Sequence, residues 1–186
     1  YLLKKHLWGG VTTNNEFYLE YSFVGDDAQN YAIDLQDGSG KLIASKNNNI
    51  SIKTLDDIIL EYHFVPNFIK IDTDGFDFKV LRSAESALIS YKPTLYFEWD
   101  KIHLQAQGED PLSIFDYLHR LGYEKCIIYD NFGNMFCIVE SKDSTNLSLL
   151  LDYTTISNQN IYYYDVLSFH KDSGLNYLDF LNNLKQ

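Results

Sequence analysis

The stretch Phe68-Ile-Lys-Ile-Asp-Thr-Asp-Gly-Phe-Asp-Phe-Lys-Val-Leu81 decides the fold of this chain. Its apolar run, residues 68–71, leads into Asp72, Asp74 and Gly75, after which the hydrophobic spacing becomes helical. The run does not alternate strictly, which is typical of a buried parallel strand. Open α/β sheets bind ligands at the carboxyl ends of parallel strands. The junction therefore predicts an α/β fold with a site beside the two acids.

The neighbouring segments extend this pattern in both directions. Thr54, with Asp57 three residues later, predicts the N-cap of a helix that precedes the strand. Beyond Gly75, apolar residues at three- and four-residue spacings predict one helix as far as Leu88. Residues 94–98 form the next predicted strand, which also ends in a carboxylate. Strand, helix and strand with short connections predict a right-handed parallel crossover.

The remaining elements follow from spacing and turn residues. Downstream, we predict a polar loop at 99–110, a helix at 111–121, a hairpin of strands 125–129 and 134–139, a helix or loop at 141–160, a strand at 161–169 and a helix at 175–184. Upstream, we predict a helix at 2–8 and strands at 16–24, 30–35 and 50–54. At 186 residues the chain is most simply one domain, spanning 1–186.

Composition and charge exclude several classes of function. With 45% hydrophobic residues the chain predicts a folded globule, and its net charge of −11 disfavours a nucleic-acid partner. The chain has no apolar run long enough for a membrane span and no signal-peptide pattern, so we expect a cytoplasmic protein. Cys126 and Cys137 are predicted to be buried, unreactive thiols, and no cysteine or histidine spacing predicts a metal site. The oligomeric state is not readable.

The acids after the first strand allow two interpretations from the residues alone. In the first, Asp74 and Asp77 cap a helix and Asp72 accepts hydrogen bonds from loop amides. In the second, Asp72 and Asp74 face a ligand crevice together with Glu98 at the end of the next strand. Asp-Thr-Asp also resembles the D-x-D pattern of nucleotide-sugar glycosyltransferases, in which both acids hold a divalent metal.

A longer pattern resembles the FkbM-type methyltransferase family. It consists of Thr54-Leu-Asp-Asp-Ile-Ile, then residues 68–84, then Pro93-Thr-Leu-Tyr-Phe-Glu98, and the similarity extends over about residues 50–135. The resemblance implies a Rossmann-like class I methyltransferase sheet, mainly parallel, with an antiparallel hairpin near the C-terminus. It also implies binding of S-adenosylmethionine and methylation of a hydroxyl on a small-molecule or glycan acceptor, such as a sugar or a secondary metabolite.

The resemblance also implies roles for particular residues. Asp72 and Asp74 fall at the fourth-strand motif beside donor and acceptor, and Glu98 falls at the next strand end. Gly25-Asp26-Asp27 matches the region that contacts adenine, and His103 is a further candidate base. Asp74 and Asp77 replace the family's glutamates, which keeps the charge, and Ser83 replaces a glycine. The predicted catalytic residues are thus Asp72, Asp74 and Glu98.

One part of the family pattern is missing. The first strand with its D-x-G-x-x-x-G turn, which holds the methionine part of the cofactor, is absent, as is the second strand. We therefore expect the sequence, which lacks these N-terminal strands, to be the later part of a longer protein. The alternative is a catalytically inactive methyltransferase-like binding domain.

Overall fold

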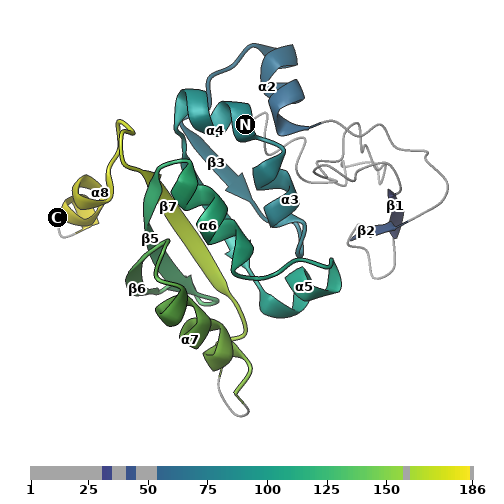
Figure 1. Cartoon of the computed structure of the whole chain (residues 1–186), viewed down its shortest axis with the longest axis vertical. Coiled ribbons are helices and arrows are strands. Elements are labelled where there is room, and N and C mark those ends of the chain that lie inside the picture. The colour runs from purple at the N-terminus through teal and green to yellow at the C-terminus, as the bar shows by residue number, and fades with distance from the viewer. Residues whose placement is uncertain (1–30, 35–40, 45–53, 157–159, 185–186) are drawn as a thin grey trace, which may run out of the picture. The chain divides into compact units, whose positions relative to one another are not determined.

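The structure, a computed structural model, describes residues 31–34, 41–44, 54–156 and 160–184 (Figure 1). The predicted elements at 2–8, 16–24 and 50–53 and the Gly25-Asp26-Asp27 turn lie outside these residues. Contacts divide the chain into two units, 1–64 with 79–85 and 65–78 with 86–186. That the whole chain acts as one domain stays a prediction.

The first unit contains a two-stranded sheet and the helix predicted after Thr54. Strands β1 (Tyr31–Asp34) and β2 (Lys41–Ala44) pair antiparallel. Helix α2 (Leu55–Tyr62) begins with a capping box, since Thr54 Oγ1 accepts from the Asp57 amide at 3.0 Å and Asp57 Oδ2 accepts from the Thr54 amide at 3.2 Å. This confirms the predicted N-cap.

Ser83 joins two segments of the first unit. Its hydroxyl donates to the Val80 carbonyl at 2.7 Å and accepts from the amide of Leu55 at 3.1 Å. The neighbouring Ala84 amide bonds to the carbonyl three residues earlier, which is a tighter turn than an α-helix makes. The single helix predicted through Leu88 is therefore wrong, because the chain forms α3 (Asp77–Arg82) and α4 (Glu85–Tyr91).

We expect Ser83→Ala to lower the free energy of unfolding by about 1–3 kcal/mol, because the buried amide of Leu55 loses its acceptor. Ser90→Ala serves as control, since Ser90 is exposed on α4 and its replacement should change stability by less than about 0.5 kcal/mol. Urea denaturation measures both. Equal effects would contradict a structural role of the Ser83 hydroxyl.

The second unit is built on a five-stranded sheet. Its strands lie in the order β3 (Phe68–Ile71), β4 (Thr94–Trp99), β7 (Tyr164–His170), β5 (Tyr123–Asp130) and β6 (Met135–Glu140). β3 and β4 pair parallel, as the crossover predicted, and β5 and β6 form the predicted hairpin. β7 runs antiparallel to both β4 and β5.

The prediction of a mainly parallel sheet is wrong for the described strands. Of the pairings in the five-stranded sheet, β3–β4 is parallel and the other three are antiparallel. The physical reason is the position of β7, which enters between β4 and β5 from the opposite direction. Because β7 opposes both neighbours, β3, β4 and β5 still point the same way, so their carboxyl ends lie at one edge.

Four further helices belong to this unit: α5 (Lys101–Ala106), α6 (Ser113–Arg120), α7 (Ser144–Thr154) and α8 (Tyr177–Leu184). Figure 1 shows α6 crossing the face of the sheet. α5 contradicts the polar loop predicted at 99–110. Its sequence is half polar, but Asp100 caps its first turn by accepting from the Ile102 and His103 amides. The end of β4 thereby leads directly into a helix.

Aromatic side chains fill the core between α6 and the sheet. Trp99 and Phe115 meet edge to face with their ring centroids 4.7 Å apart, and Trp99 Nε1 donates to the Pro111 carbonyl at 2.8 Å. Cys126 is buried and free, and burial raises its thiol pKa to about 12. Cys137 is also free but only half-buried, so the prediction of two buried thiols is confirmed for Cys126 and wrong for Cys137.

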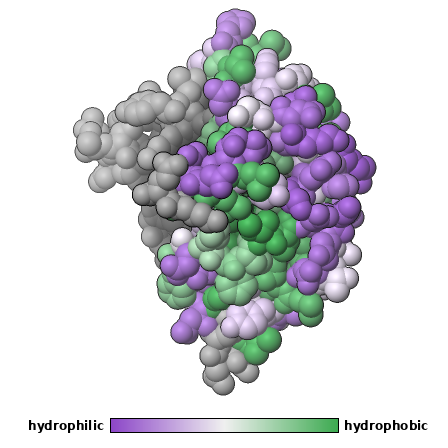
Figure 2. Space-filling view, turned by 90° about the vertical axis from the view of Figure 1, so that its left-hand side faces the viewer, coloured by the Kyte–Doolittle hydropathy of each residue, from purple (hydrophilic) through white to green (hydrophobic). Residues whose placement is uncertain are grey.

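Exposed hydrophobic side chains collect on the outer strand of this sheet. Met135, Phe136 and Ile138 of β6 are exposed. Figure 2 views the molecule from the side where β6 lies in Figure 1, and it shows hydrophobic side chains gathered there beside hydrophilic ones. Among the described helices, none is both long enough and apolar enough to cross a membrane.

Candidate functional site

The turn after β3 has an unusual backbone. Asp74 and Gly75 follow one another with φ angles of 49° and 94°. Aspartate tolerates this left-handed region better than most residues, but at Gly75 a second constraint acts. A Cβ at that position would lie 2.5 Å from the carbonyl oxygen of His103. The turn therefore packs directly against α5, and no side chain larger than hydrogen fits between them.

Asp77 lies beneath this turn. Its side chain is fully buried, and its Oδ2 accepts from the Thr73 hydroxyl at 3.1 Å and from the Gly75 amide at 3.3 Å. Its Oδ1 has no hydrogen-bond partner in the described part of the chain. Burial raises the pKa of Asp77 to about 6 despite these hydrogen bonds. The turn is thus built over a carboxyl group that is costly to ionise.

Glu98 reaches the same place from β4. Its side chain is 13% exposed, and its Oε1 lies 3.5 Å from His103 Nδ1. Burial, together with the nearby charge of Asp77, raises the pKa of Glu98 to about 7, although the contact with His103 opposes the shift. In the sheet register, Glu98 faces Asp165 of β7, so a further carboxyl group lies on the same face of the sheet.

Asp100 fixes the position of His103. Oδ1 of Asp100 accepts from the amides of Ile102 and His103 at 2.7 and 3.1 Å, and its Oδ2 lies 3.5 Å from His103 Nδ1. One carboxylate therefore holds both the start of α5 and the imidazole ring. The ring is 42% exposed, so a ligand can reach it from solvent.

We expect Asp100→Ala to cost about 1–2 kcal/mol of unfolding free energy, because α5 loses its N-cap. Asp100→Asn keeps a capping oxygen and should cost clearly less. Thermal unfolding followed by circular dichroism compares the two variants. If alanine and asparagine are equally harmful, the carboxylate acts through its charge and not as a cap.

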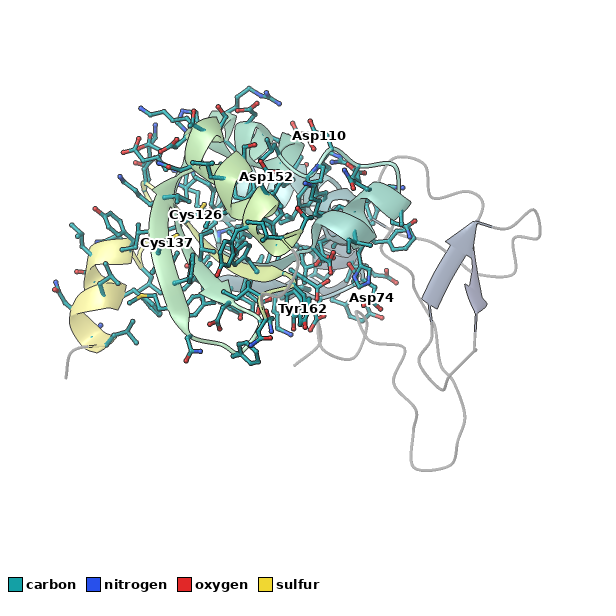
Figure 3. All side chains as sticks on the ribbon, turned by 90° about the horizontal axis from the view of Figure 1, so that it is seen from below. Asp74, Asp110, Cys126, Cys137, Asp152 and Tyr162 are labelled. Atoms are coloured by element: carbon teal, nitrogen blue, oxygen red, sulfur yellow. The ribbon has the colours of Figure 1, made fainter. Side chains whose placement is uncertain are left out.

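The structure brings together some of the predicted site residues and separates one. The side chains of Asp74, Glu98 and His103 converge, with one candidate ligand atom from each lying within 4.8 Å of the others. Asp72, in contrast, forms an ion pair with Lys70 at 2.7 Å and is not part of this set. Figure 3 shows Asp74 near the edge of the sheet and well apart from Cys126 and Cys137.

Two important residues were not predicted as part of the site. Asp100 falls in the predicted loop, although an aspartate directly before apolar residues at helical spacing is an N-cap signal that could have located α5. Asp77 was interpreted as a helix cap, and nothing in its spacing indicates that it is buried under the turn. Gly25-Asp26-Asp27, the predicted adenine contact, lies outside the described residues.

Comparison with known proteins identifies the family to which the chain belongs. The profile of the methyltransferase FkbM domain matches residues 7–125, more than half of the 186 residues. The chain therefore belongs to the FkbM methyltransferase family. The match includes Asp72, Asp74, Glu98 and His103, so the strand-end site lies within the shared domain. No curated protein and no solved structure matches the chain.

Proposed function

We propose that the protein is an S-adenosylmethionine-dependent O-methyltransferase acting on a hydroxyl of a sugar or secondary metabolite. Membership of the FkbM family supports methyl transfer in general. The observation that carries the finer proposal is the convergence of Asp74, Glu98 and His103 at the carboxyl ends of the parallel strands β3 and β4. Ligands of open α/β sheets bind at this edge.

The chemistry of this edge fits a positively charged donor. Asp72 and Asp74 both present accessible carboxylates beside the partly buried Glu98. A carboxylate-rich edge attracts a cationic ligand such as a sulfonium. When bound, S-adenosylmethionine supplies an electrophilic methyl group. We assign Asp72 to the donor among the described residues, and the family resemblance assigns Gly25, Asp26 and Asp27 to its adenine.

Asp74, Glu98 and His103, which we call the convergent set, act on the acceptor. Transfer to a hydroxyl requires that its oxygen be oriented and that its proton be withdrawn. Asp74 and His103 are accessible, whereas the more buried Glu98 and Asp100 each place a carboxylate oxygen 3.5 Å from His103 Nδ1. The set therefore offers a hydroxyl two accessible polar groups, with the carboxylates of Glu98 and Asp100 close to the imidazole ring.

The rival functions differ in their ligands. A nucleotide-sugar glycosyltransferase would use Asp72 and Asp74 together on a metal, but Asp72 is paired with Lys70 and lies outside the convergent set. An inactive methyltransferase-like domain would keep the fold and bind neither donor productively. We further propose a cytoplasmic location and a small-molecule or glycan acceptor.

Isothermal titration calorimetry distinguishes these functions. We expect heat with S-adenosylmethionine and with its demethylated product, and none with UDP-sugars in the presence of Mn²⁺. Binding heat with a UDP-sugar that depends on Mn²⁺ would contradict the proposal and favour a glycosyltransferase. The absence of binding heat with both donors would favour a domain that does not catalyse methyl transfer.

A further inference from the structure

We propose that Asp74, Glu98 and His103 form a binding site for a divalent metal ion. The three side chains come from different segments: the turn after β3, the end of β4 and the first turns of α5. They supply two carboxylates and one imidazole, all of them metal ligands in proteins. Because the ligands are not at regular spacing in the sequence, no sequence motif reveals them.

The distances suit one shared ion. One candidate ligand atom from each residue lies within 4.8 Å of the others. Bonds of carboxylate oxygen and imidazole nitrogen to a metal are about 2.0–2.2 Å long, so two ligands of one ion lie at most about 4.4 Å apart. The side chains of Asp74 and His103 are accessible, so rotation about their side-chain bonds can bring the ligand atoms the few tenths of an ångström closer that a shared ion requires.

A fully buried carboxylate beside the set gives an independent indication of a cation. Asp77 lies directly under the turn that carries Asp74. Its Oδ2 accepts from Thr73 and Gly75, but its Oδ1 lacks any partner among the described residues. Buried carboxylates are normally paired with a cation or with hydrogen-bond donors. Lys70 does not meet this need, since it is exposed and paired with Asp72. A divalent ion at the convergent set would offset the excess negative charge.

The surroundings of His103 also resemble those of a metal ligand. Histidines that bind metals usually direct their second ring nitrogen towards a carboxylate, which fixes the ring. Oδ2 of Asp100 lies 3.5 Å from His103 Nδ1, and Asp100 is itself held by two backbone amides. Asp100 can therefore hold the ring in place beside Glu98, whose Oε1 lies 3.5 Å from the same nitrogen.

The ligand types favour a particular kind of ion. Two carboxylates suit Mg²⁺, Ca²⁺ and Mn²⁺, whereas an imidazole suits transition metals. Mn²⁺ satisfies both preferences, so we expect it to bind more tightly than Mg²⁺. Three protein ligands leave coordination positions open for a hydroxyl oxygen. The suggested role, activating the acceptor hydroxyl, rests on the proposed function, but the binding of the ion does not.

Titration of the full chain with Mn²⁺, followed by the electron paramagnetic resonance signal of the free ion and without a methyl donor, tests the site. We expect saturable binding at one ion per chain. Asp74→Asn, Glu98→Gln and His103→Gln should each weaken it at least 10-fold, while Asp72→Asn should leave it unchanged. Circular dichroism checks that each variant is folded, and asparagine at position 74 still tolerates the left-handed backbone.

Two outcomes would overturn the site. One is the absence of saturable Mn²⁺ binding by the folded wild type. The other is loss of binding in Asp72→Asn with full retention in His103→Gln, which would place the ion on the two aspartates instead. Calorimetry with S-adenosylmethionine in a chelator separates this result from the proposed function. If the protein binds S-adenosylmethionine but not Mn²⁺, only the proposed metal site is contradicted. If it binds Mn²⁺ but not S-adenosylmethionine, only the proposed methyltransferase function is contradicted.

Discussion

Gly75→Ala is expected to destabilise the protein by about 3 kcal/mol or more and to abolish ligand binding at the strand-end site. Two causes add. The backbone at Gly75 has φ of 94°, and the new Cβ would lie 2.5 Å from the His103 carbonyl oxygen. Because the obstacle is backbone, relief requires moving α5 away from the turn. That movement separates Asp74 from His103. Urea denaturation and Mn²⁺ titration measure the two effects.

Gly108→Ala is the matched control for this prediction. Gly108 also has a positive φ, 74°, but a Cβ there meets no atom within 4 Å. Its replacement should therefore cost only the backbone strain, about 1 kcal/mol, and leave Mn²⁺ binding intact. If both alanine variants lose the same stability, the close approach of the turn to α5 is not what requires a glycine at position 75.

Glu98→Gln is expected to make the metal-free protein more stable at pH 8 while removing methyl transfer. The folded state raises the pKa of Glu98 from 4.5 to about 7, chiefly by burial. Between these two values the folded protein holds a proton that the unfolded chain has lost. The free energy of unfolding therefore falls as the pH rises from about 4.5 to 7, and the full penalty remains above pH 7.

Glutamine removes this penalty because it cannot ionise. We expect a gain of about 1–3 kcal/mol at pH 8 that disappears below pH 4.5. Denaturation in a chelator at a series of pH values measures it, since a bound cation would mask the effect. Asp77, whose pKa is also raised, contributes a fall of the same sign in both proteins.

Glu140→Gln provides a control with the opposite sign. Lys125 lowers the pKa of Glu140 through a hydrogen bond of 2.7 Å, so its charged form favours the folded state. Its removal should slightly destabilise the protein at pH 8. If Glu98→Gln also destabilises the protein at pH 8, Glu98 is not held in an unfavourable charged state. A selective gain in stability with loss of activity would mark Glu98 as a functional residue.

Much of the fold was predictable because its local signals agree with its tertiary structure. The apolar run before Asp72, the capping box at Thr54 and the turn of the β5–β6 hairpin all carry such signals, and all three elements formed as predicted. The helix interruption at Ser83 did not follow from spacing, because the Ser83 hydroxyl bonds to Leu55, which is 28 residues away. A contact of that kind is not a local property of the sequence.

The site was predictable only in part for a related reason. Asp74 and Glu98 were placed together because parallel strands end at one edge of a sheet. His103 joins them only because α5 starts immediately after β4 and packs against Gly75. A six-residue helix in which polar and apolar residues alternate, with Leu104 as its buried residue, gives almost no helical periodicity. The positions of His103 and Asp100 therefore depended on a helix that spacing could not predict.

The most direct test of the proposed function is transfer of a radiolabelled methyl group from S-adenosylmethionine to a panel of sugars and hydroxylated secondary metabolites. The full chain is assayed with and without Mn²⁺, beside Glu98→Gln. We predict that the wild type labels at least one hydroxyl compound and that Glu98→Gln lowers this transfer at least 100-fold while remaining folded. Donor binding without transfer to any acceptor, or equal transfer by both proteins, would contradict the role given to the strand-end site.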